Sequence, residues 1–354
     1  MKFESVLYYV VVSLLATVLL LFFFLIFHKL FIEFTERRKR HLHSRYSSCM
    51  RKYLLGRDGV IVIPRSRLGF EVLSALCIEK FQTAPEEDQE IIKQFIRGAS
   101  LVNYYQKMAE SSAMPKRFHA IKRLGNFSLD ELKPYFKDRI LEEKTDEVKG
   151  AIVWAMSRIA DDNTLDWIAR MLSKEISLSS KYNEYVYTNL IHSFKSKGII
   201  DKFLAYVERS IADKNLPRIL KRDIIEACGS SGLHEASRLI VDFYFNSDDQ
   251  SAIKIACMRA LGKLECPEFR GVVTSALFHD DWRIRSQAAR AASAGHESAI
   301  PHLRHLLYDE YYYVRINAAR SLFQLGGEGL SLLESELNSD DPFVRDTVRF
   351  MLRK

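Results

Sequence analysis

The first hydrophobic pattern along the chain is an uninterrupted apolar run near the amino end, over residues 6–27. It contains no charged residue, and as a helix it would be about 33 Å long, enough to cross a hydrocarbon core of about 30 Å. The pattern therefore predicts a single transmembrane helix. A cleaved signal peptide is the alternative, but that needs a shorter apolar core followed by small residues, whereas this run ends in Phe22–Phe27 and His28.

Beyond residue 113 the apolar positions recur with the spacing of amphipathic helices, in short segments separated by turns. These segments pair into successive helical hairpins, so the pattern predicts an all-α chain. The predicted pairs are 115–124 with 129–142, 146–160 with 163–175, 181–196 with 199–213, 217–229 with 233–246, 249–264 with 267–278, 281–294 with 298–308, and 311–325 with 328–338, closed by a helix over 341–353.

One short motif returns three times in the last hundred residues. Aligning Arg285, Arg315 and Arg345 gives a period of 30 residues, which fits a unit of two helices. The three copies are Asp280–Arg290, Asp309–Arg320 and Asp340–Arg349.

Each copy carries the features of a helix start and of a closely packed helix. The acidic residues before each run are suited to cap a helix, and Pro342 stands where a missing N–H group costs nothing. The pairs Ala288–Ala289 and Ala318–Ala319 are strong helix formers, and their small side chains let a neighbouring helix approach closely. Gly295 and Gly326–Gly327 are predicted to end helices.

The motif Val/Ile-Arg-x-x-Ala-Ala-x-x-Leu-x-x-Leu-Gly is present almost whole from Val314 to Gly326. With it the chain resembles HEAT-repeat proteins, in the variant similar to phycobilisome-lyase HEAT-like repeats, clearly over 250–354 and more weakly upstream. The resemblance implies a right-handed α-solenoid with a concave surface that holds a partner. It also implies a ladder of hydrogen bonds between successive repeats. The residues that match this ladder are Asp281, Asp309 and Asp341 with Arg285, Arg315 and Arg345.

The amino-terminal third is less regular than the repeats. Helices are predicted over 68–82 and over 86–109 after Pro85, following a connector that includes a short extended run closed by Pro64. The chain is therefore expected to divide into four parts. They are a short extracytoplasmic end with the transmembrane helix (1–27), a basic juxtamembrane segment and connector (28–67), an N-terminal helical cap (68–112) and the HEAT-like solenoid (113–354).

The net charge of +7 is concentrated in one segment. Residues 28–53 hold eight Lys and Arg against Glu33 and Glu36, which leaves residues 54–354 close to neutral. By the positive-inside rule, the amino end is expected outside and the repeats in the cytoplasm, at the inner membrane of a cell. A nearly neutral repeat region gives no reason to expect nucleic acid as a partner.

The centre of the basic segment has two interpretations. One is a stop-transfer signal only, and the other is a surface that docks on anionic lipid headgroups, to which each basic side chain contributes about 1 kcal/mol. The residues concerned are Arg37, Arg38, Lys39 and Arg40.

The five cysteines are odd in number and contain no C-x-x-C pair, so we expect reduced thiols in a reducing compartment.

Candidate catalytic and metal-binding groups each have a simpler structural interpretation. Gly326–Gly329 follows no predicted strand and is expected to be a turn rather than a phosphate loop. Two histidine groups, His302 with His305 and His41 with His43 near Cys49, lack further metal ligands. Paired aspartates recur at helix starts, where capping explains them better than acid–base chemistry. They lie at 161–162, 248–249, 280–281 and 340–341. We therefore expect no cofactor, no metal and no enzymatic activity.

Aromatic and arginine side chains at the start of inner helices are typical of binding hot spots. The motif leaves four such residues without a ladder role. These candidate partner-binding residues are Trp282, Arg283, Tyr311 and Tyr312.

The sequence thus favours a membrane-anchored cytoplasmic scaffold that binds a protein, most simply an integral membrane protein in the same bilayer. A single span followed by HEAT-like repeats is a layout similar to bacterial accessory subunits of membrane glycosyltransferases that make and export polysaccharides. The alternatives are a HEAT-like enzyme, either a bilin lyase or a DNA glycosylase, and a membrane-tethered sensor of a defence or signalling system. A glycosylase would need a basic groove, which the nearly neutral repeat region disfavours.

Overall fold

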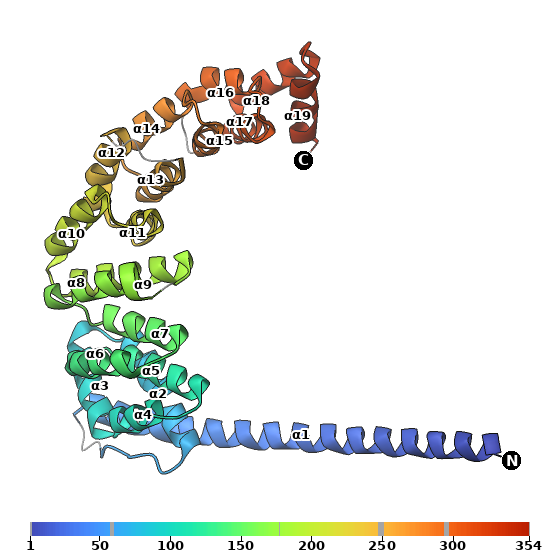
Figure 1. Ribbon diagram of the computed structural model, residues 1–354, viewed down its shortest axis with the longest axis vertical. Coiled ribbons are helices and arrows are strands. Elements are labelled where there is room, and N and C mark those ends of the chain that lie inside the picture. The colour runs from blue at the N-terminus through green and yellow to red at the C-terminus, as the bar shows by residue number, and fades with distance from the viewer. Residues whose placement is uncertain (1, 57–59, 177, 247–250, 294–296, 354) are drawn as a thin grey trace. The chain divides into compact units, whose positions relative to one another are not determined.

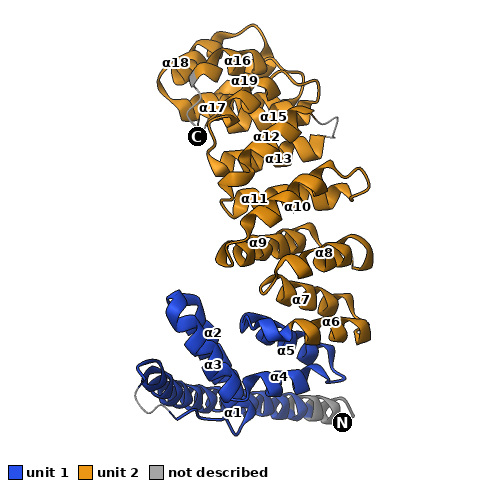
Figure 2. Ribbon diagram, turned by 90° about the vertical axis from the view of Figure 1, so that its left-hand side faces the viewer, with its two compact units in different colours: residues 1–132 blue, residues 133–354 orange. Residues whose placement is uncertain are grey.

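The computed structural model describes residues 2–56, 60–176, 178–246, 251–293 and 297–353, and every regular element within them is helical. The chain divides into two compact units, Met1–Leu132 and Lys133–Lys354 (Figures 1 and 2). The division falls inside the helix expected over 129–142 and later than the expected boundary at 112/113. Asp248–Asp249 and Gly295 lie outside the described residues.

Unit 1 is built on one very long helix, α1. Its helices are α1 (Lys2–Leu54), α2 (Arg67–Thr83), α3 (Glu86–Gly98), α4 (Leu101–Ala109) and α5 (Met114–Asn126), followed by the short η1 (Asp130–Leu132). Ser66 caps α2 by accepting a hydrogen bond from the Gly69 N–H at 3.1 Å.

The helix expected over 86–109 is two helices in the structure. Ser100 adopts a φ of 57° between α3 and α4, and this left-handed backbone ends one helix before the next begins. The expectation of one helix was wrong because a left-handed backbone conformation is usually predicted at Gly or Asn, and Ser100 gives no such signal.

The helix α1 is long and apolar enough to cross a membrane, by length and composition. At 53 residues it is about 80 Å long. All side chains from Val12 to Phe34 are exposed, unlike those of a core helix. Its carboxyl end packs on its own unit, because Tyr46 and Met50 are buried and the Tyr53 ring lies 5.3 Å from that of Phe95. The helix therefore crosses the expected boundary at 27/28 and extends well into the expected connector.

The helices of unit 2 form two rows, and each hairpin contributes one helix to each row (Figure 1). Within the inner row, each helix packs on the next. The inner row is α7 (Asp146–Ser157), α9 (Ser180–Ser196), α11 (Arg218–Ser230), α13 (Ser251–Leu264), α15 (Trp282–Ala291), α17 (Tyr312–Leu325) and α19 (Pro342–Leu352). The outer row is α6 (Lys133–Glu142), α8 (Asp162–Arg170) with η2 (Met171–Glu175), α10 (Ile200–Ala212), η3 (His234–Ala236) with α12 (Ser237–Asn246), α14 (Phe269–Ala276), η4 (Glu297–Ala299) with α16 (Ile300–Leu306), and α18 (Gly327–Ser335) with η5 (Glu336–Asn338). These hairpins confirm the predicted all-α solenoid.

Small residues set the close approach of the inner helices. A Cβ atom on Gly229 of α11 would lie 2.5 Å from the Cα of Ala260 in α13, so no side chain fits between these backbones. In the next repeats Ala288 and Ala318 are completely buried, as the motif predicted. Gly326, with a φ of 65°, ends α17.

Buried serines link neighbouring inner helices. Ser193 donates to the Ala160 carbonyl at 2.8 Å, and Ser321 donates to the Ala289 carbonyl at 2.6 Å. The two bonds join different pairs of repeats: the Ala160 carbonyl lies in the loop after α7, and the Ala289 carbonyl lies in the last turn of α15. No cysteine forms a disulfide within the chain as described, and only Cys49 is not fully buried.

Candidate partner-binding surface

The repeated arginines hold the loops that precede the last three inner helices. Arg285, Arg315 and Arg345 each donate from Nη1 to two backbone carbonyls, six and five residues earlier in the chain, at 2.5–3.0 Å. The same clamp therefore fixes the loop in three successive repeats. These arginines have a structural role, and most of their bonds lie within one repeat.

The ladder expected between repeats has one arginine–aspartate rung. The Arg285 Nε donates to Asp309 Oδ2 at 2.7 Å, and both side chains are largely buried. At the aligned position of the next repeat Ser339 replaces Asp309, and Arg315 is left with a buried Nε that has no hydrogen-bond partner among the described residues. The expected regular ladder is therefore wrong beyond its first rung.

The aspartates at the helix starts act as caps, as predicted. Asp281 Oδ1 accepts from the Arg283 N–H at 2.8 Å, and Asp341 Oδ1 accepts from the Phe343 N–H at 2.8 Å. The hydrogen bond from the Arg283 guanidinium, followed by the Ser251 hydroxyl, holds the pKa of Asp281 far below its usual range. The Ser251 hydroxyl of α13 donates to Asp281 Oδ2 and so ties this cap to the preceding repeat.

Exposed rings gather at the amino ends of α15, α17 and α19. We call the five residues Trp282, Tyr311, Tyr312, Tyr313 and Phe343 the aromatic edge. The half-buried Trp282 stacks on Tyr311 and Tyr313, with ring centroids 5.0 and 6.1 Å apart. The other four side chains are between 39% and 64% exposed. The structure therefore brings three of the predicted candidates, Trp282, Tyr311 and Tyr312, into one surface.

The aromatic edge contains two residues that the sequence did not single out. Tyr313 packs edge-on against Tyr312 at 5.6 Å, and Phe343 covers the Arg315 guanidinium at 5.2 Å. Each of them stands two residues before a clamp arginine, as Arg283 does before Arg285. Aligning the three repeats at these arginines would therefore have identified both positions.

The fourth candidate, Arg283, is engaged with its own helix cap. Its Nε and Nη2 atoms donate to the two oxygens of Asp281 at 3.0 and 2.8 Å, although the side chain is 60% exposed. Arg283 therefore lies beside the rings without being a free cation.

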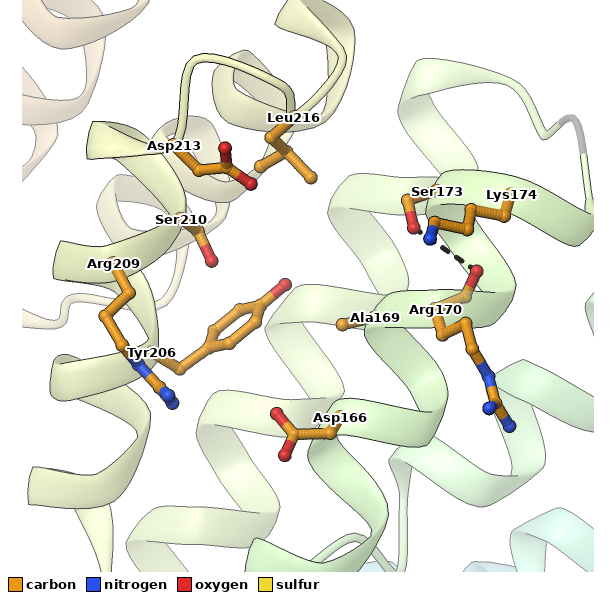
Figure 3. A pocket seen from close by; sticks show the side chains of 10 residues that line it. All are labelled: Asp166, Ala169, Arg170, Ser173, Lys174, Tyr206, Arg209, Ser210, Asp213 and Leu216. Carbon is orange, nitrogen blue, oxygen red and sulfur yellow. Dashed lines mark hydrogen bonds between the residues drawn. The ribbon is translucent and has the colours of Figure 1, made fainter.

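A separate feature of unit 2 is a groove of about 550 Å³ on the outer row, between α8 with η2 and α10 (Figure 3). Its charged side chains have both signs, with Arg170, Lys174 and Arg209 against Asp166 and Asp213. Burial raises the pKa of its tyrosine, Tyr206, and this phenol therefore stays protonated at neutral pH.

Nothing in the described part of the chain gathers three metal-binding side chains. His302 packs edge-on against Phe278 at 4.7 Å. Gly326 alone separates α17 from α18, and Gly327–Gly329, expected within a turn, form the start of α18.

The basic cluster lies on α1, with its side chains exposed or partly exposed. Two of its four cations have carboxylate neighbours, Lys39 with Glu36 at 2.7 Å and Arg37 with Glu33 at 3.9 Å. The other two, Arg38 and Arg40, form no ion pair with any described residue.

Sequence comparison finds the HEAT-repeat family model over residues 238–322, and no curated protein matches the chain. Solved structures with similar chains include the Escherichia coli protein YibA, at 12% identity and a TM-score of 0.43, with 83% of this chain and 100% of that chain covered. Kap121p bound to Pho4p is similar at 12% identity and 0.44, over 88% and 41% of the two chains. The CpcE–CpcF complex of phycocyanin lyase from Nostoc is similar at 16% identity and 0.26, over 83% and 98%. Residues 238–322 are HEAT repeats, within a chain that has the fold of a HEAT-like α-solenoid.

Proposed function

We propose that this protein is a non-catalytic scaffold, anchored in a membrane by α1, which binds another protein through the aromatic edge. The observation that carries the proposal is the edge itself, where four exposed rings and a stacked tryptophan come from three successive repeats. Contiguous exposed rings on a soluble body are unusual and mark interaction surfaces.

The anchor is proposed at residues 6–27, with the amino end outside and the repeats in the cytoplasm, at the inner membrane. Exposure of the apolar side chains of α1 supports this, since water is a poor solvent for them and lipid a good one. The basic segment on the carboxyl side supports the orientation.

The cluster Arg37, Arg38, Lys39 and Arg40 is proposed to contact anionic lipid headgroups. Arg38 and Arg40 would contribute most, because Lys39 and Arg37 already have carboxylate neighbours. Near an anionic surface each free cation contributes about 1 kcal/mol.

The partner is proposed to be an integral membrane protein of the same bilayer, because confinement to one membrane raises the effective concentration of each protein for the other. The layout favours a role as accessory subunit of a membrane complex such as a polysaccharide-synthesising glycosyltransferase. We propose no enzymatic activity for the outer-row groove or for the aromatic edge.

The test is affinity purification of the full-length chain in mild detergent, followed by identification of stoichiometric co-purifying membrane proteins. The double variant Trp282→Ala/Tyr312→Ala should lose the partner while its thermal unfolding remains close to that of the natural protein. A matched control removes two exposed rings elsewhere in unit 2, as Tyr185→Ala/Phe245→Ala. Equal recovery of the partner with both variants would exclude the aromatic edge.

A further inference from the structure

Beside its rings, the aromatic edge presents one exposed carboxylate from each of three successive repeats. Each stands five residues before a clamp arginine and is exposed. Within the ranges that the structure describes, none of the three side chains forms a hydrogen bond or an ion pair. The three residues are Asp280, Glu310 and Asp340.

The clamp arginines hold these carboxylates in equivalent places. The backbone carbonyls of Asp280, Glu310 and Asp340 accept from arginine Nη1 atoms at 2.7, 3.0 and 3.0 Å. The backbone that carries each carboxylate is thus fixed in the same way in each repeat. Because packed helices lie about 8–10 Å apart, the carboxylates recur at about that interval along the edge.

The cations of the edge offset only part of this negative charge. Arg285 and Arg315 are mostly buried and donate to loop carbonyls, while Arg283 is paired with Asp281. The loop carbonyls do not neutralise Arg315 and Arg345, so the edge keeps Asp280, Glu310, Asp340 and Asp341 against these two cations, which is a negative surplus. The faces of the exposed tyrosine rings and of Trp282 also attract cations.

We propose that the aromatic edge binds an extended segment of the partner that carries Lys or Arg at every third residue. In the polyproline II form of an extended chain, which has three residues per turn and advances about 3.1 Å per residue, every third side chain points to the same side at intervals of about 9 Å, the interval between the carboxylates. The aliphatic stems of such side chains lie along the rings while their charged ends reach Asp280, Glu310 and Asp340.

This inference rests on the proposed function and adds the chemistry of the partner. Cytoplasmic segments of membrane proteins close to the bilayer are enriched in Lys and Arg, so the proposed class of partner offers such segments.

The first experiment measures fluorescence anisotropy of labelled nine-residue peptides with the full-length protein in mild detergent. One peptide has Lys at its first, fourth and seventh positions in a Gly/Ser background. A second has the same three Lys residues adjacent to one another, and a third has Glu in place of spaced Lys. The spaced Lys peptide should bind about tenfold or more tightly than the Glu peptide and more tightly than its isomer, with affinity that falls as salt is raised. No binding of the spaced Lys peptide, or equal binding of the two Lys isomers, would overturn the proposal.

The second experiment neutralises the carboxylates in the triple variant Asp280→Asn/Glu310→Gln/Asp340→Asn. A matched control neutralises three exposed carboxylates of the outer row, as Asp201→Asn/Glu208→Gln/Asp242→Asn. The edge variant should bind the spaced Lys peptide about tenfold more weakly than the natural protein, and the control should not change. Equal affinity of the two variants contradicts the inference.

Co-purification separates this inference from the proposed function. If the edge carboxylate variant retains the membrane partner that Trp282→Ala/Tyr312→Ala loses, the scaffold proposal stands and the basic-segment inference fails. If the aromatic variant also retains the partner, the proposed docking surface fails as well.

Discussion

The single Arg285–Asp309 rung allows an unusually clean test of what an ion pair contributes to stacking of the repeats. The variant Asp309→Ser places at this position the residue that the protein itself has at the aligned position 339. Ser339 accepts a hydrogen bond from the Asp341 N–H at 3.4 Å, just as Asp309 accepts from the Tyr311 N–H at 2.9 Å. The substitution should therefore keep the loop cap and remove only the bond to Arg285.

The magnitude follows from burial of the pair. The side chains of Arg285 and Asp309 are 14% and 6% exposed, so the guanidinium loses a charged partner at a site where water reaches it poorly. A hydrogen bond to a charged group contributes about 1.5–3 kcal/mol, and we expect a loss of about 2 kcal/mol in the free energy of unfolding. The clamp bonds from Arg285 to the His279 and Asp280 carbonyls limit the loss.

The assay is thermal and urea unfolding of the full-length protein in mild detergent, followed by circular dichroism. For a cooperative unit of repeat-region size, about 2 kcal/mol corresponds to a fall in Tm of about 4–8 °C. A double-mutant cycle with Arg285→Gln should give a coupling free energy of about 1 kcal/mol or more. The reasoning would be refuted if Asp309→Ser changed the free energy of unfolding by less than about 0.5 kcal/mol, or if the effects of the two single variants added up to that of the double variant.

The other predictions concern packing, pH and lipid contact. The variant Gly229→Ala places a Cβ atom 2.5 Å from the Cα of Ala260, and should destabilise unit 2 by about 1–3 kcal/mol in the same unfolding assay, whereas Gly271→Ala, with open space around it, should not destabilise it in this way. Burial lowers the pKa of His279, whose Nδ1 accepts from the Asp281 N–H at 3.0 Å. The folded state thus binds fewer protons than the unfolded state below the ordinary histidine pKa of about 6.5, so stability should fall as the pH drops through that value. The variant His279→Asn should reduce this slope, and an unchanged slope would assign it to other groups. Replacing Arg38 and Arg40 by Gln should weaken contact of α1 with anionic lipid headgroups. The measurement is cross-linking of the α1 segment to headgroups at several salt concentrations, with the full-length protein in anionic and in neutral nanodiscs, and equal cross-linking of the natural protein in both lipids would contradict lipid docking.

Most of the repeat architecture could be predicted because the relevant signals are local. Apolar spacing, acidic caps and glycines mark each hairpin, so the segment expected over 181–196 is observed as α9, Ser180–Ser196. The break at Ser100 could not be predicted, since its left-handed backbone depends on how α3 and α4 pack within unit 1. The continuation of α1 to Leu54 was also missed, because its last turns are held by burial of Met50 rather than by a local pattern.

The candidate surface was predicted in part for a similar reason. Trp282, Tyr311 and Tyr312 stood out because the repeat motif gave them no structural role. Whether a side chain at a helix start faces water depends on the rotation of that helix, so the exposure of Phe343 could not be read from its position. Likewise, the bidentate contact between Arg283 and Asp281 arises from side-chain geometry in one turn, which spacing alone does not specify.

If α1 is the membrane anchor proposed above, its unbroken course sets how far its own unit stands from the bilayer. With the span at residues 6–27, eighteen further helical residues precede Tyr46, the first that is buried against the unit. They cover about 27 Å, whereas the headgroup layer on each side is only about 5–8 Å deep. With α1 upright in that position, unit 1 would stand clear of the lipid on a stalk, and a membrane protein that touches it would project about 20 Å from the bilayer. A tilted α1 would instead bring Arg38 and Arg40, about 16–20 Å beyond Phe27 along the helix, towards the headgroups.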